Sequence, residues 1–170
     1  VSGVDVLKNT FKNENAVNVL DPTMLMSKEF YMNEIISKYD TSKLQKGGIV
    51  TYVLDAAKEK REIISFVKEK LEIENLTHLK GFNNSKETYS VPEWLASFAN
   101  ADFVITDSFH GMVFSIIFEK EFVVIGNSKR GIDRFISLLS LLKLENRLIF
   151  DLKDLEKKDL KPIDYSRVNI

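Results

Sequence analysis

The chain has 170 residues, of which 44% are hydrophobic and 29% are charged, and its formal net charge is −1 at pH 7. This length and composition fit one folded domain and exclude an intrinsically disordered chain. The balanced charge gives no electrostatic reason to expect nucleic acid or an anionic membrane as a partner. The absence of cysteine excludes disulfides, thiolate catalysis and cysteine-ligated metals, and it favours an intracellular protein.

Apolar runs such as 122–126 are far shorter than the roughly 20 residues of a membrane-spanning helix, so no transmembrane segment is expected. The sequence shows no secretory signal peptide, and we expect a cytoplasmic protein. The chain begins with Val1 and passes at once into a helix-like segment. We therefore expect it to be part of a longer protein.

Apolar runs rich in β-branched residues alternate with segments of helical period. In chain order we expect a strand at 17–20, a helix at 27–39, a strand at 49–54, a helix at 55–73, a strand at 76–82, a helix at 94–101, a strand at 102–106, a helix at 110–120, a strand at 121–126, a helix at 132–144 and a strand at 147–150. Ser27, Asp55 and Ser90 stand at expected helix N-caps, and Ser90 with Glu93 has capping-box spacing. This alternation predicts βαβ units and a mainly parallel sheet with helices on both faces.

In such sheets, ligands bind beyond the carboxyl ends of the strands, in the turns that lead into helices. The turn after the expected strand 102–106 contains Asp107, Ser108, His110 and Gly111. Asp107 or Ser108 can cap the next helix, and Gly111 permits a close backbone approach. His110 in the first helical turn could donate to an anion or transfer a proton near neutral pH, although a structural histidine is the alternative.

The turn after the next expected strand is basic. Asn127, Lys129, Arg130 and Gly131 precede a helix, and Arg134 lies four residues after Arg130, on the same helical face. Arginine suits a bidentate grip on phosphate or carboxylate, whereas a solvated turn is the plain alternative. If the two strands are neighbours, His110 and this basic turn would converge on one anionic ligand.

Two further residues invite a functional interpretation, and we expect both to be structural. His78 has no polar cluster around it in the sequence, and Trp94 fits core packing better than a stacking surface. No metal-binding pattern is apparent.

The stretch 92–148 resembles the C-terminal part of the polysaccharide pyruvyl transferase family. The resemblance rests on the acidic-Ser-Phe-His-Gly turn, the apolar helix and strand after it, and the Asn-x-x-Arg-Gly turn followed by a Leu-rich helix. The segment 19–31, with its Asp-Pro-Thr sequence, is similar to the segment that joins the two halves of the family's fold.

This resemblance implies a Rossmann-like three-layer α/β sandwich that forms the C-terminal half of a GT-B-like fold. Residues 1–25 would be a linker or remnant of the N-terminal half, 26–150 the Rossmann-like domain, and 151–170 a charged C-terminal tail. The absent N-terminal domain would then be a partner of this one. Since GT-B chemistry takes place between the halves, we expect the 170-residue chain to be inactive alone.

The implied reaction transfers a pyruvyl group from phosphoenolpyruvate to two hydroxyls of a cell-surface or exopolysaccharide sugar, with no cofactor. The acceptor would be a sugar or a lipid-linked saccharide, which could bring the protein to the inner membrane surface. Carried over by position, the family's histidine falls on His110, as general acid or phosphate ligand. The implied substrate-binding residues of the two turns are Ser108, Gly111, Asn127, Lys129, Arg130 and Arg134.

One departure from the family pattern concerns position 108. Some members carry a basic residue two positions before the histidine, where this chain has Ser108. Anion binding would then rely more on the helix terminus and on Arg130. Two alternatives stay open: a nucleotide-sugar-dependent GT-B glycosyltransferase or epimerase-like half-domain, and a non-catalytic binding domain in polysaccharide biosynthesis.

Overall fold

The computed structural model describes residues 3–17, 19–82, 88–127, 131–158 and 161–168. Within this part of the chain, five parallel strands form one sheet in the order β2-β1-β3-β4-β5. The strands are β1 (Ile49–Tyr52), β2 (Leu76–Lys80), β3 (Phe103–Thr106), β4 (Glu121–Ile125) and β5 (Leu148–Ile149). The α-helices are α1 (Gly3–Phe11), α2 (Lys28–Phe30), α3 (Lys58–Leu71), α4 (Val91–Asn100), α5 (Phe109–Ile117), α6 (Ile132–Leu141) and α7 (Leu152–Lys157).

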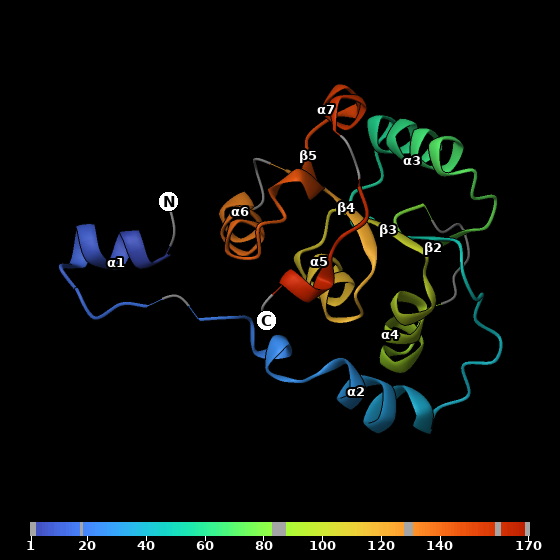
Figure 1. Cartoon of the computed structure of the whole chain (residues 1–170), viewed down its shortest axis with the longest axis horizontal. Helices are drawn as coiled ribbons and strands as arrows, with labels where there is room; N and C mark the ends of the chain where they lie inside the picture. Colours follow the sequence, from blue (N-terminus) through green and yellow to red (C-terminus); the bar gives the residue numbers. More distant parts are fainter. Residues whose placement is uncertain (1–2, 18, 83–87, 128–130, 159–160, 169–170) are drawn as a thin grey trace.

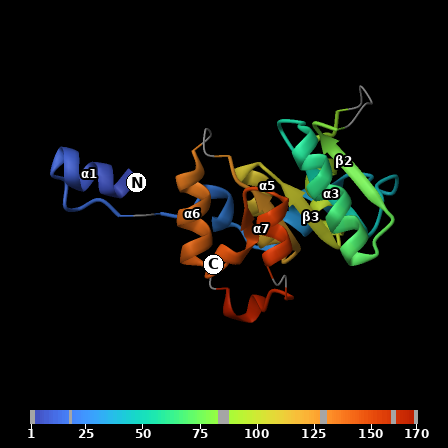
Figure 2. The same cartoon turned by 90° about the horizontal axis from the view of Figure 1, so that it is seen from above.

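Both faces of the sheet are covered by helices, as Figures 1 and 2 show. Strand residues alternate between the faces, as the two-residue period of a strand requires. Ile105 and its neighbours pack with α3 and α7, whereas Val104 and its neighbours pack with α4, α5 and α6. The expected Rossmann-like three-layer α/β sandwich with a parallel sheet is thereby confirmed.

The expected helix starts are partly confirmed. Ser90 and Glu93 form the reciprocal capping box of α4, and Ser27 accepts a hydrogen bond from the Phe30 amide at the start of α2. The prediction that Asp55 caps the next helix is wrong, because α3 begins after Ala57. The expected helix at 27–39 is also not one α-helix: it passes through a π-helical segment, Tyr31–Ile35, into a 3₁₀ turn, Ile36–Lys38.

The strand expected at 17–20 is absent from the described residues of that range. Val17 and Val19 are exposed and pair with no strand of the sheet. A short apolar run does not by itself distinguish a strand from other structure, and this run has no neighbouring strand to pair with among the described residues. The chain instead crosses to a 3₁₀ turn, Pro22–Leu25, which contacts α5. Helix α1 lies apart from the layered body and has no buried residue (Figure 1).

Two segments outside the βαβ units pack firmly on the domain. Near the N-terminus, Met24 and Tyr31 are buried in the core, and the Tyr31 ring lies edge-on to Phe114, with centroids 5.2 Å apart. Near the C-terminus, buried Arg147 forms an ion pair with Glu121 at 3.0 Å and donates to the Lys161 carbonyl. Residues on both sides of the 26–150 domain expected from the sequence therefore contact it.

The two residues that the sequence marks as structural lie in packed surroundings. Trp94 is in contact with the rings of Tyr52, Phe98 and Phe114. On β2, Nδ1 of His78 is hydrogen-bonded to Oγ1 of Thr51 at 2.6 Å. Core packing of Trp94, rather than an exposed stacking surface, is thus confirmed.

Candidate functional site

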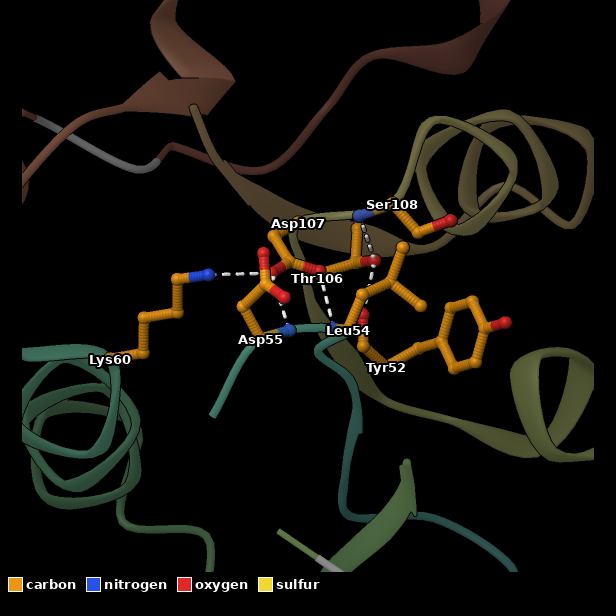
Figure 3. Close-up of polar contacts among 7 residues, drawn as sticks. All are labelled: Tyr52, Leu54, Asp55, Lys60, Thr106, Asp107 and Ser108. Atoms are coloured by element: carbon orange, nitrogen blue, oxygen red, sulfur yellow. Dashed lines mark hydrogen bonds and ion pairs between the residues drawn. The ribbon is translucent and has the colours of Figure 1, made fainter. Parts of the chain in front are cut away.

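The turn between β3 and α5 is fixed by hydrogen bonds to the end of β1 (Figure 3). The Thr106 hydroxyl donates to the Tyr52 carbonyl at 2.7 Å and accepts from the Ser108 amide at 3.0 Å. One buried side chain thus joins two strands and sets the direction in which the chain leaves the sheet. This geometry positions the residues that follow, Phe109 and His110.

Asp107 adds a second link, made by a buried carboxylate. Its oxygens accept from the amides of Leu54 at 2.7 Å and Asp55 at 3.3 Å, and they form an ion pair with Lys60 Nζ at 2.6 Å. The Asp107 side chain is only 3% exposed, and that of Lys60 is 12% exposed. Figure 3 shows Lys60 reaching this carboxylate from α3.

These contacts occupy the position where ligands commonly bind in this topology. In the order 2-1-3-4-5, the switch point lies between β1 and β3, and ligands usually bind there beyond the strand ends. Here Asp107 bridges that crevice with bonds to the main chain after β1.

Helix α5 starts with a serine cap. The Ser108 hydroxyl accepts from the Gly111 amide at 3.4 Å, so Ser108 is the N-cap, and it is buried. A Cβ on Gly111 would lie 2.2 Å from Thr106 Oγ1, a separation that no side chain tolerates. Both residues shape the start of α5, and their expected contact with substrate stays a prediction.

His110 projects from the first turn of α5 toward the N-terminal segment. Its side chain is 55% exposed, and its Nε2 lies 3.8 Å from Asp21 Oδ2. Asp21 caps the 3₁₀ turn Pro22–Leu25, with Oδ1 accepting from the amide of Thr23 at 3.0 Å and from its hydroxyl at 2.6 Å. The other carboxylate oxygen, Oδ2, therefore faces His110.

The charges around Asp21 favour its ionised form. Burial by itself would raise the pKa of this carboxyl, but the Thr23 hydrogen bonds and the nearby His110 and Arg134 side chains outweigh it. The pKa of Asp21 is therefore below its ordinary value. This site thus carries a carboxylate beside an imidazole and an arginine.

Arg134 joins the site from α6. Its guanidinium carbon lies 4.9 Å from the centroid of the Phe109 ring, which in turn packs edge-on against Phe135 at 5.6 Å. A groove of about 640 Å³ runs along this face of α6. Its lining includes Leu20, Asp21, Phe109, Asp133, Arg134 and Ser137.

The remaining predicted site residues lie in the sequence between β4 and α6. Asn127 lies two residues after the end of β4, at the same edge of the sheet as the turn after β3. Gly131 precedes α6 in the left-handed conformation, with φ +56°, which glycine adopts without strain. Lys129 and Arg130 lie outside the described residues, so their convergence with His110 stays a prediction.

Asp21 is the site residue that the sequence analysis did not identify. Its local signal is an acidic residue before Pro22 at the first position of a helical turn, which indicates a cap and not a ligand site. Only the packing of Met24 and Tyr31 against α5 brings it to His110. The contact spans about ninety positions of sequence, which no local pattern predicts.

Within the described ranges, no group of three or more His, Asp or Glu side chains is arranged to hold a metal ion. Over the same residues, no helix combines the length and apolar character that crossing a bilayer requires.

The fold and this site define a Rossmann-like α/β domain with a groove along α6 that is lined by charged side chains, among them Asp21 and Arg134. The sequence model of the polysaccharide pyruvyl transferase family matches residues 1–129 of the 170, and the chain belongs to this transferase family. The match includes Asp21 and the whole turn around His110. No curated protein and no solved structure matched the chain.

Proposed function

We propose that this domain takes part in pyruvyl transfer from phosphoenolpyruvate to a sugar of a cell-surface or exopolysaccharide, giving a cyclic ketal and phosphate. The observation that carries the proposal concerns Asp21, which lines the groove together with Arg134 and has His110 Nε2 3.8 Å from its Oδ2, in a chain of the pyruvyl transferase family. The described lining offers Arg134 to an anionic donor, and polar side chains such as Ser137 to a sugar.

The anionic donor suits the arginine side chain of the site. Phosphoenolpyruvate carries a phosphate and a carboxylate, and an arginine guanidinium binds either group through two parallel hydrogen bonds. Arg134 is exposed at the groove and braced over Phe109. We assign Arg134 to donor binding, together with Lys129 and Arg130, which precede Gly131 in the sequence.

The reaction needs proton transfer, which is the role proposed for His110. C3 of the enol gains a proton while a hydroxyl attacks C2, and a histidine titrates in the range where it can supply that proton. As the alternative within this proposal, His110 donates a hydrogen bond to the departing phosphate. In both roles it must face solvent and substrate, which agrees with its half-exposed side chain.

The test uses the full-length protein, phosphoenolpyruvate and a panel of pyranosides with a 1,2- or 1,3-diol, because only such pairs of hydroxyls close a five- or six-membered ketal. Phosphate release and the ketal methyl signal in NMR spectra are followed. We expect acceptor-dependent activity in the wild type and a loss of about 10²–10⁴-fold in His110→Ala. Unchanged activity in His110→Ala would reject the role of this residue.

The two alternative functions predict different outcomes. A nucleotide-sugar-dependent enzyme would be stabilised thermally by a UDP-sugar and not by phosphoenolpyruvate. A non-catalytic binding domain would bind saccharide without releasing phosphate. The proposed site of the reaction is the cytoplasm, with a lipid-linked acceptor bringing the protein to the inner membrane surface.

A further inference from the structure

We infer that Asp21 is a second catalytic residue, which accepts the proton of the attacking sugar hydroxyl while His110 delivers a proton to C3 of the donor. The inference rests on the proposed function and adds to it a base that the family resemblance does not assign. It starts from the 3.8 Å approach of Asp21 Oδ2 to His110 Nε2 and from the place of Asp21 in the lining of the groove.

The two oxygens of Asp21 have different surroundings. Oδ1 is held by the amide and hydroxyl of Thr23, which orients the carboxylate. Oδ2 faces His110, and the side chain keeps 20% exposure. A carboxylate that is fixed through one oxygen and accessible through the other is suited to accept a proton from a bound hydroxyl.

The segment that carries Asp21 is packed on the core of the domain. Tyr31 donates its hydroxyl proton to the Thr23 carbonyl at 2.7 Å, and its ring packs on Phe114 of α5. Met24 is buried in the same cluster. The position of Asp21 relative to His110 is therefore set by core packing, as a catalytic pair requires.

Electrostatics separates the two substrates at this site. The described titratable or charged groups that act on Asp21 are His110 and Arg134, and Asp133 also lines the groove. An anionic donor is repelled by the Asp21 carboxylate and attracted by the arginine, whereas a neutral hydroxyl is a good hydrogen-bond donor to the carboxylate. Before the first addition, the ionised Asp21 would therefore contact the acceptor hydroxyl and not phosphoenolpyruvate. Once it is protonated, the carboxyl can approach the phosphate.

The protons and bonds balance over the two additions. In the first, protonated His110 gives its proton to C3, the first hydroxyl oxygen forms a bond to C2, and the hydroxyl proton passes to Asp21. In the second, the other hydroxyl oxygen bonds to C2 as the bond from C2 to the phosphate oxygen breaks. Its proton returns to His110, and Asp21 gives its proton to the phosphate, so both residues end as they began.

The experiment uses the full-length protein and three variants. Asp21→Asn keeps the shape of the side chain and an oxygen for Thr23, but it removes the base. Asp21→Ala leaves space for a small carboxylate. Asp164→Asn is the matched control, because Asp164 caps a 3₁₀ turn and accepts from the amide of Ser166 at 3.3 Å and its hydroxyl at 2.6 Å, as Asp21 does from Thr23.

We expect Asp21→Asn to lower kcat by about 10²–10⁴-fold while KM for phosphoenolpyruvate changes little. Added formate should restore a measurable part of the activity of Asp21→Ala, since it can take the place of the missing carboxylate. Asp164→Asn should retain wild-type activity and show no response to formate.

Activity of Asp21→Asn within a few-fold of the wild type would overturn the inference. A failure of formate to activate Asp21→Ala would also overturn it, provided that this variant still binds phosphoenolpyruvate and keeps the wild-type fluorescence of Trp94. Asp21 would then have a structural role only. A wild type without phosphoenolpyruvate-dependent transfer would instead refute the proposed function.

Discussion

Gly111 lies so close to Thr106 that a Cβ at position 111 would come within 2.2 Å of the Thr106 hydroxyl oxygen. The same hydroxyl donates to the Tyr52 carbonyl. The glycine beside His110 is therefore required by the packing of α5 on the sheet. The glycine thus has a structural reason that does not depend on a ligand.

Replacing Gly111 with alanine tests this relationship. We expect Gly111→Ala to lower the free energy of unfolding by about 1–3 kcal/mol, because the added methyl must displace Thr106. Urea denaturation followed by fluorescence of Trp94, the single tryptophan, measures it. Gly3→Ala is the control, since a Cβ there meets nothing within 4 Å. Equal effects of the two substitutions would contradict the steric explanation.

The ion pair of Asp107 and Lys60 should couple strongly in a double-mutant cycle. Removing one partner leaves the other charge buried, and such losses cost about 3–5 kcal/mol. We expect the double variant Asp107→Asn with Lys60→Met to be clearly less destabilised than the sum of the singles. Lys58 and Glu62, an exposed pair on the same helix at 3.7 Å, should show a coupling of at most about 0.5 kcal/mol. A coupling that small for Asp107 and Lys60 would show that their contact does not stabilise the turn.

Arg134 should affect donor binding much more than stability. Its side chain is exposed, so Arg134→Met should change the free energy of unfolding by less than about 1 kcal/mol. Loss of a bidentate charged contact should raise KM for phosphoenolpyruvate about 10–100-fold, with Arg134→Lys intermediate. Steady-state kinetics of the full-length protein measures both. Arg167→Met, which removes another exposed arginine, is the control, and an unchanged KM in Arg134→Met would exclude Arg134 from donor binding.

His78 should make stability depend on pH in mildly acidic solution. Burial, and next the nearby charge of Arg61, lower the pKa of His78 in the folded protein. As pH falls below about 6.5, the usual value for histidine, the unfolded chain takes up a proton that the folded chain does not. The contribution to stability is therefore present above that pH and decreases below it. Urea denaturation between pH 7.5 and 5.5 should show a smaller decline of the free energy of unfolding in His78→Gln than in the wild type. An identical decline in both would contradict the role of His78 in this pH dependence.

Local patterns in the sequence predicted much of the fold. The alternation of β-branched runs with amphipathic segments predicted the five parallel strands and helices α3 to α6, because burial on two faces imposes these periods. The capping box of Ser90 and Glu93 could also be predicted, because all of its contacts lie within four residues of sequence. The strand expected at 17–20 was wrong, because a strand needs a partner that a short apolar run cannot reveal.

The sequence by itself placed His110 after a buried strand and Arg134 in the helix that follows the next strand. It also contained the motifs that resemble the pyruvyl transferase family. Only the tertiary structure decided that Asp107 bridges the crevice between β1 and β3, and that Asp21 faces His110. The physical reason is the separation along the sequence of the residues that make each contact. Caps and periodicities are contacts between near neighbours, whereas the site depends on how Met24 and Tyr31 pack against α5, about ninety residues away along the chain.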